Sequence, residues 1–79
     1  MASIKVHVQP GLFASERIAT FVADGQHYEV MVDAADLDGD RLRIEVLATV
    51  LDRVVVRLPG DTVAAGRTLS VPQEIVDAV

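Results

Sequence analysis

The sequence predicts a single, mainly all-β domain over residues 1–79: a small antiparallel barrel of five or six strands followed by a short C-terminal helix. Three observations predict it. Apolar and polar residues alternate over several short runs, which is the period of a half-buried strand. Turn-forming residues separate these runs at intervals of about 8–12 residues, a spacing typical of sandwiches and barrels. The length suits one domain.

The stretch 17–32 predicts a β-hairpin around Asp24-Gly25. A two-residue type I′ turn needs positive φ at both positions, which Asp-Gly adopts at low steric cost. With these two residues as the loop, Phe21 should pair with Tyr28. One face then carries the predicted core, namely Ala19, Phe21, Tyr28, Val30 and Val32. The opposite face carries Ile18, Thr20, Val22, His27, Glu29 and Met31.

Before this hairpin, the alternation of Ile4, Val6 and Val8 with polar residues predicts a strand with one wet face, which Pro10-Gly11 ends. Leu12-Phe13 follows in a short connection. We expect these two side chains to plug the end of the core. The alternative is an exposed contact for a partner.

A second hairpin is predicted over Arg41–Leu58. Its first strand alternates apolar and charged residues up to Val46, and then the phase slips. The slip indicates either a β-bulge or a strand that is buried on both faces. The strand Asp52–Leu58 follows, but the turn 51–53 contains no glycine, so the register of this hairpin stays open.

The remaining segments are short. Pro59-Gly60-Asp61 predicts a turn, Thr62–Ala65 a strand extension that Gly66 breaks, and Thr68–Val71 a last strand.

A helix is then predicted from a capping box, with Ser70 as N-cap, Gln73 as its reciprocal partner and Pro72 in the first turn. Its apolar face would carry Val71, Ile75 and Val79.

Composition limits the function classes. There is no cysteine, so the chain has no disulfide and no thiolate metal site, which is typical of the reducing cytoplasm, where we expect this protein. We expect no signal peptide and no membrane span, because no apolar run has the length that either requires. The net charge of −5 makes the chain a poor match for nucleic acid.

No residue pattern indicates catalysis, a metal site or a cofactor. His7 and His27, the two histidines, fall on the predicted wet faces, and no serine has the glycine-rich context of a nucleophile. The acidic segment Asp33–Asp40 departs from a calcium loop, because a count from Asp36 finds neither the required glycine nor the required glutamate. We therefore expect a solvated turn; weak cation binding is the alternative. The chain is predicted not to be an enzyme.

Four arginines on the two strands of the second hairpin form a predicted cationic strip: Arg41, Arg43, Arg53 and Arg57. We expect them to pair across the strands with Glu45 and Asp52. The alternative is a contact with an acidic partner or a phosphate.

The segment 24–30, Asp-Gly-Gln-His-Tyr-Glu-Val, resembles the first motif of Sm-like proteins, which reads Asp-Gly-Arg, an aromatic position and a glycine. Arg57 and Gly60-Asp61 resemble its second motif, Arg-Gly-Asp, with two residues inserted. The resemblance covers about half of the chain and implies an SH3-like barrel, with RNA-binding rings of six or seven subunits as the family function. The family's RNA loop has no counterpart here.

The segment 66–78 is similar to a Gly-Arg…Ile-Pro-Lys-Glu-Ile-Arg segment of AbrB-like swapped-hairpin DNA binders. Gln73 and Val76 stand at its basic positions.

Two functions follow as expectations. The first is a non-catalytic protein-interaction module that forms homo-oligomers, with Ile18, Val22 and Met31 as the interface. The second is an Sm-like RNA-binding ring that uses the arginine strip.

Overall fold

The computed structural model describes residues 2–62 and 66–78, which form nine β-strands and two 3-10 helices. The elements are β1 (Ala2–Lys5), β2 (His7–Pro10), β3 (Glu16–Ala23), β4 (Gln26–Asp33), η1 (Ala34–Asp36), β5 (Leu37–Asp38), β6 (Arg41–Val50), β7 (Arg53–Thr62), β8 (Gly66–Pro72), η2 (Gln73–Ile75) and β9 (Val76–Ala78).

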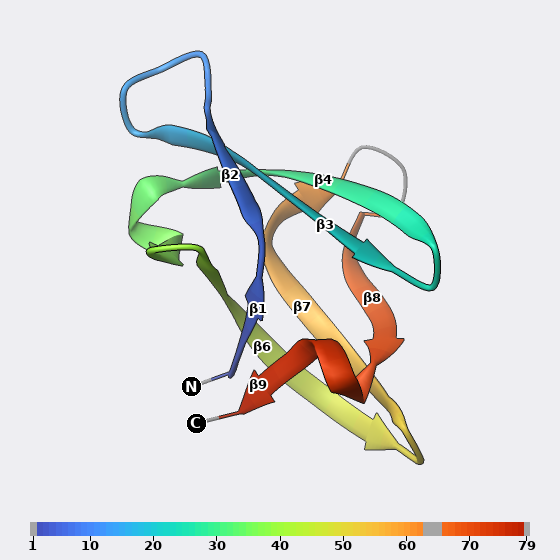
Figure 1. Ribbon diagram of the computed structural model, residues 1–79. Helices are drawn as coiled ribbons and strands as arrows, with labels where there is room; N and C mark the ends of the chain where they lie inside the picture. The colour runs from blue at the N-terminus through green and yellow to red at the C-terminus, as the bar shows by residue number, and fades with distance from the viewer. Residues whose placement is uncertain (1, 63–65, 79) are drawn as a thin grey trace.

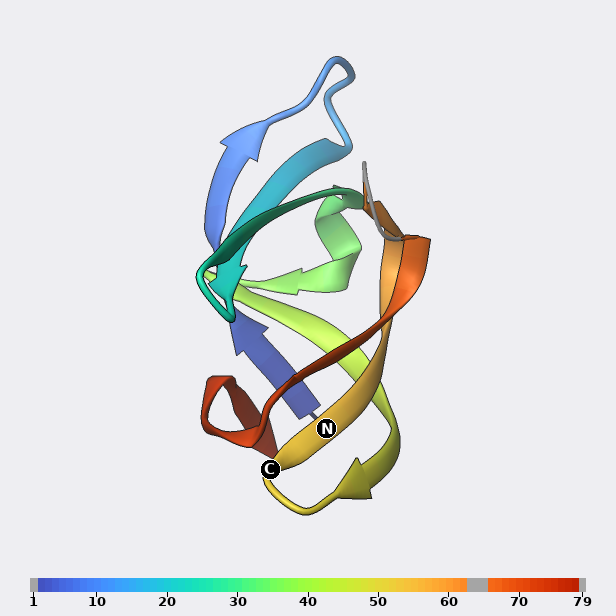
Figure 2. The same ribbon diagram turned by 90° about the vertical axis from the view of Figure 1, so that its right-hand side faces the viewer.

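All strand pairs are antiparallel, and the sheet order is β2-β3-β4-β7-β6-β1-β9, with β5 beside β6 and β8 beside β7. The sheet curls into a half-barrel (Figures 1 and 2). The all-β antiparallel class is thus confirmed. The prediction of a barrel of five or six strands is wrong, because the curl stays open and the described residues form nine strands.

One bent strand links the two ends of the curl. β1 pairs with β6 and β2 pairs with β3, and only Val6 separates β1 from β2. Val6 is buried, and its N–H donates to the carbonyl of Asp40 at 2.8 Å. At this junction the chain itself, rather than strand pairing, connects the two ends of the sheet, which β4 and β7 join on the other side through the pair Val30–Thr62.

The β3–β4 hairpin has the predicted register. Phe21 pairs with Tyr28 and the rings stack, with centroids 5.3 Å apart. Asp24 and Gly25 both have positive φ, at 55° and 73°, as a type I′ turn requires. The predicted core face is buried or half-buried throughout.

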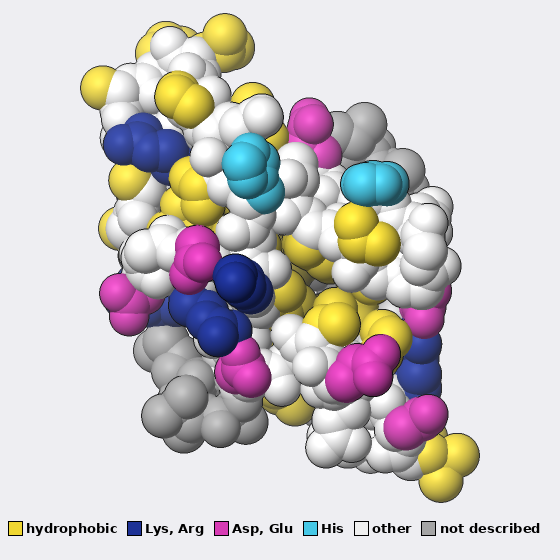
Figure 3. Space-filling view, in the orientation of Figure 1, with side chains coloured by type: hydrophobic (Ala, Val, Ile, Leu, Met, Phe, Trp, Pro, Cys, Tyr) yellow, Lys and Arg dark blue, Asp and Glu magenta, His cyan; other side chains and the backbone are white. Residues whose placement is uncertain are grey.

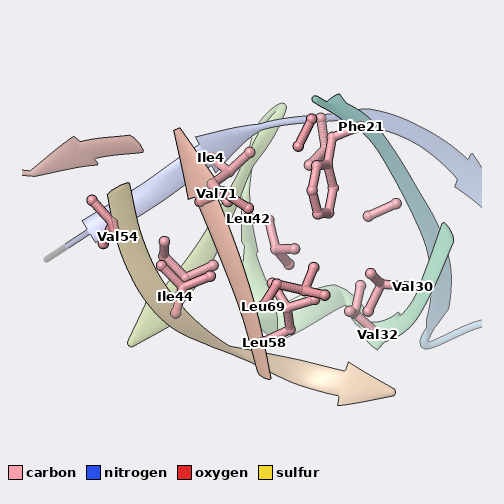
Figure 4. Close-up of a cluster of buried hydrophobic side chains, with 14 residues drawn as sticks. Ile4, Phe21, Val30, Val32, Leu42, Ile44, Val54, Leu58, Leu69 and Val71 are labelled. Carbon is pink, nitrogen blue, oxygen red and sulfur yellow. The ribbon is translucent and has the colours of Figure 1, made fainter. Parts of the chain in front are cut away.

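The core lies inside the curl, where apolar side chains from strands on every side meet (Figure 4). Its largest fully buried members are Ile4, Val30, Leu42, Val56, Leu58 and Val71.

The second hairpin settles two open points. Val50 pairs with Arg53, so its loop is Leu51-Asp52, and the register shifts between Val46 and Ala48. The predicted bulge is therefore confirmed. The alternative, a strand buried on both faces, is wrong, because every residue from Glu45 to Val50 is exposed.

Two predicted elements near the C-terminus are wrong. Pro59-Gly60-Asp61 is not a turn, because β7 continues through it to Thr62. The helix is absent from the described residues: Ser70 lies inside β8, paired with Val55, and η2 is followed by strand β9. Residues 63–65 and Val79, which the predictions also included, lie outside the described residues.

The prediction that Leu12-Phe13 packs against the end of the core is wrong. The two side chains are 86% and 70% exposed. The loop is held by hydrogen bonds within itself. The Gly11 N–H donates to the Glu16 carbonyl, and the Arg17 guanidinium donates to the carbonyls of Ala14 and Glu16.

Candidate functional site

The four predicted arginines do not form one free cationic strip. Arg41 binds Asp77, and Arg57 binds Glu45 at 3.1 Å, which confirms the expected cross-strand pair. Arg43 donates to the carbonyl of Ala35 at 2.5 Å. In the view of Figure 3, basic side chains are interspersed with acidic ones.

Arg53 forms the best-defined ion pair, although with Asp24 and not with Asp52. Its two terminal nitrogens donate to the two carboxylate oxygens of Asp24 at 2.7 and 2.8 Å. It also donates to the carbonyl of Ser70 at 2.8 Å. The bidentate geometry joins the β3–β4 turn to β7 and β8. The hydrogen bonds from Arg53, reinforced by its positive charge, lower the pKa of the Asp24 carboxyl.

Asp24→Asn is expected to lower the Tm at neutral pH, because the amide keeps the positive φ but loses the charge-assisted pair. A depressed carboxyl pKa stabilises the folded state above the ordinary value of 3.8 and stops doing so as the pH falls through the lower folded value. The Tm difference between the two proteins should therefore shrink from pH 7 to pH 2. Thermal unfolding followed by circular dichroism measures it.

Asp38→Asn is the matched control, because this exposed carboxylate has no ion pair among the described residues. It should leave the Tm unchanged at both pH values. A pH-independent Tm difference for Asp24→Asn would contradict the role given to the ion pair.

The predicted interface residues Ile18, Val22 and Met31 all lie on the outer face of the β3–β4 hairpin, but they do not form one patch. Ile18 pairs with Met31, whereas Val22 pairs with His27. The polar pair Thr20–Glu29 lies between these two pairs. On the neighbouring strand β2, Gln9 lies beside Ile18 and His7 lies beside Thr20. Polar side chains therefore separate Val22 from Ile18 and Met31 on this face.

The histidines and the acidic segment do not come together as a site. His7 and His27 are exposed, and Figure 3 shows both imidazoles on the outer surface. The Asp33 carboxylate caps η1 by accepting a hydrogen bond from the Ala35 N–H at 2.8 Å. The Asp33 N–H in turn donates to the Asp36 carboxylate at 3.1 Å. Within residues 2–62 and 66–78, no three histidine or acidic side chains are grouped so that they could hold a metal ion.

One surface hollow, of about 310 Å³, lies between β1, β3 and η2. Its apolar walls include Phe21 and Ile75. Four charged side chains also line it, namely Arg41 and Asp77, which bind each other, and Lys5 and Glu74. None of the described residues that line it is a histidine or a serine. The lining is mixed, apolar on one part and charged on the other.

The sequence interpretation missed the distal half of β6, Glu45–Val50. Its side chains are exposed, including Val46, Leu47 and Val50. β7 pairs with one edge of this segment, and no strand in the described part of the chain pairs with the other, since the described residues of β1 pair with Arg41–Ile44. The change of phase in the sequence after Val46 could have indicated this exposure. It places apolar residues on both faces of the strand, and a single buried face cannot hold all of them.

In residues 2–62 and 66–78 there is no helix of the length and hydropathy needed to cross a membrane. No family model, no curated protein and no solved structure matches the chain, so its resemblance to Sm-like and AbrB-like proteins stays a prediction.

Proposed function

We propose that this chain is a non-catalytic β-domain that acts as a self-associating protein-interaction module. The distal half of β6 carries the proposal, because it combines exposed apolar side chains with a strand edge that no strand of residues 2–62 and 66–78 pairs with. Apolar side chains gathered at a surface favour association, and an open edge supplies backbone donors and acceptors for it. A domain this small also buries only about 60% of its unfolded surface, so association adds stability that the monomer lacks.

The test is the solution mass by light scattering over a range of protein concentrations, at low and high salt. A dimer that persists at high salt supports the proposal, because apolar contacts are not screened by ions. A monomer at every concentration overturns it.

A ring-sized mass of six or seven subunits would favour the Sm-like RNA-binding function instead. RNA binding would then have to weaken steeply with salt, because phosphate contacts release counterions. In the described chain the four arginines of the strip each have a carboxylate or carbonyl partner, so RNA would compete with those contacts.

A further inference from the structure

We propose that the Asp24–Arg53 ion pair is a latch that holds the turn end of the β3–β4 hairpin closed against β8, and that this end opens locally when the latch is released. The turn end is the part of the hairpin from the pair Phe21–Tyr28 to the pair Ala23–Gln26, with its turn. The inference goes beyond self-association, because it concerns contacts within one chain.

The strand pairs that fix the β3–β4 hairpin to its neighbours lie at its base. β2 pairs with β3 only as far as Thr20, and β7 pairs with β4 at Val30. Within residues 2–62 and 66–78, the strands of the turn end therefore pair only with each other. Side chains attach this end to the rest of the molecule, through its buried inner face and through the ion pair with Arg53.

Arg53 reaches the outer edge of β8, which is the edge that faces away from β7. The Gln73 N–H donates to the Asp52 carbonyl, in the same register as the pairs of β7 with β8. Hydrogen-bonded and non-hydrogen-bonded pairs alternate along antiparallel strands, so Ser70 and Val55, three positions further, form a non-hydrogen-bonded pair. The backbone carbonyl of Ser70 therefore points to the outer edge, where the Arg53 guanidinium binds it at 2.8 Å.

One guanidinium thus joins the turn to β8. Its two terminal nitrogens donate to the Asp24 carboxylate, and one of them also donates to the Ser70 carbonyl. The Nε atom donates to the Ser70 hydroxyl at 3.3 Å. Because the guanidinium is planar and its donors have fixed directions, these bonds hold only while the turn and β8 keep their relative positions.

Release of the latch would uncover the outer edge of β8. β8 pairs with β7, and no other strand of the described residues pairs with it. A strand edge with free backbone groups is a template for another strand. The closed hairpin therefore shields the outer edge at Ser70 from strand addition.

Thiol labelling of the native protein measures the opening, because the chain has no cysteine of its own. Ala23→Cys places a thiol at the turn end and Ala19→Cys places one at the base, where the two alanines are 3% and 0% exposed. Cysteine is a small side chain that suits buried positions. Each variant is labelled over a range of urea concentrations below its unfolding transition.

The dependence on urea separates local opening from global unfolding, because it scales with the surface that becomes exposed. At low urea we expect Ala23→Cys to react faster than Ala19→Cys, at a rate that hardly changes with urea. The rate for Ala19→Cys should follow global unfolding. Equal rates with equal urea dependence would overturn the local opening.

Asp24→Asn in the Ala23→Cys protein tests the latch. Asparagine tolerates the positive φ of the turn, so this change removes the ion pair and keeps the backbone. The labelling rate at low urea should rise roughly two- to fivefold, the range typical of an exposed ion pair. An unchanged rate would overturn the latch.

Glu45→Gln is the matched control, because it removes the exposed ion pair with Arg57 on the β6–β7 hairpin. That pair is the same whether the turn end is open or closed, so the labelling rate should not change. An increase equal to that of Asp24→Asn would contradict the role of the Asp24–Arg53 pair. Circular dichroism shows that each variant is folded.

Relaxation dispersion of the backbone amides of residues 21–26 replaces the labelling if Ala23→Cys does not fold, because it detects motion on the microsecond to millisecond timescale without a cysteine. Exchange that is confined to the turn end and that Asp24→Asn increases supports the latch. Its absence in both proteins would overturn the latch.

Discussion

Phe21→Ala is expected to lower the free energy of unfolding by about 3–5 kcal/mol, the largest loss predicted for this chain. The ring lies inside the curl, 6% exposed, and stacks on Tyr28 across the hairpin. Its removal forfeits both the transfer of the ring from water and the stacking, and it leaves a cavity that the sheet cannot close. Urea unfolding followed by far-UV circular dichroism measures the change.

Val22→Ala is the control for this prediction, because Val22 is the next residue along β3 and points to the outer face. Its truncation should change the free energy of unfolding by no more than about 0.5 kcal/mol. Equal losses at the two positions would contradict the assignment of the inner and outer faces of the hairpin.

Gly60→Ala should also be strongly destabilising, by about 1–3 kcal/mol or more, for a steric reason. A Cβ at this position would fall on the carbonyl oxygen of Met31 and 3.2 Å from its carbon. The obstacle is backbone of β4, so no side-chain rotation relieves it, and β4 and β7 would have to separate. β4 and β7 pair at one position, Val30 with Thr62, which lies next to Gly60 and Met31. Thermal and urea unfolding of the variant test the prediction.

Gly39→Asn serves as its comparison. Gly39 has φ of 64° and open space where a Cβ would lie. Asparagine tolerates positive φ, so this variant should be near neutral. If Gly60→Ala proved as mild as Gly39→Asn, the close approach of β4 and β7 would be wrong.

Local sequence was sufficient where a short turn fixes the structure. Asp24-Gly25 sets the register of the whole β3–β4 hairpin, so the core face and the Phe21–Tyr28 pair could be predicted residue by residue. The irregularity near Leu47 was visible for a similar reason, because a change of phase within a single strand can be read in the sequence. The sequence left a bulge and a strand buried on both faces as alternatives, and the register decides for the bulge.

Local sequence failed where distant pairing overrides it. Ser70 to Gln73 has the pattern of a capping box, but β8 pairs with β7 there, and Val71 is fully buried beside Val54. Pro59-Gly60 has the composition of a turn, yet the glycine lets β7 pass against the backbone of Met31. Both outcomes depend on which strand lies alongside, and no local pattern encodes that.

The candidate site was predictable in part. The arginines could be placed on adjacent strands, and the pair of Arg57 with Glu45 followed from that placement. The partner of Arg53 could not be predicted, because Asp24 reaches it only through the curl of the sheet. The exposed distal half of β6 was missed because its exposure depends on which residues of β6 pair with β1, and no local pattern gives that pairing.

The pairing of β1 has a consequence for the order of folding. β1 lies between two strands that are distant in the chain: all of it pairs with β6, and Ala2–Ile4 also pair with β9. Contacts between residues so distant in the chain raise the contact order, which slows folding. The β3–β4 and β6–β7 hairpins can form on the microsecond timescale from neighbouring residues. During synthesis, β1 can pair with β6 before β9 is made, and until β9 follows, the edge of β1 that β9 later covers stays open.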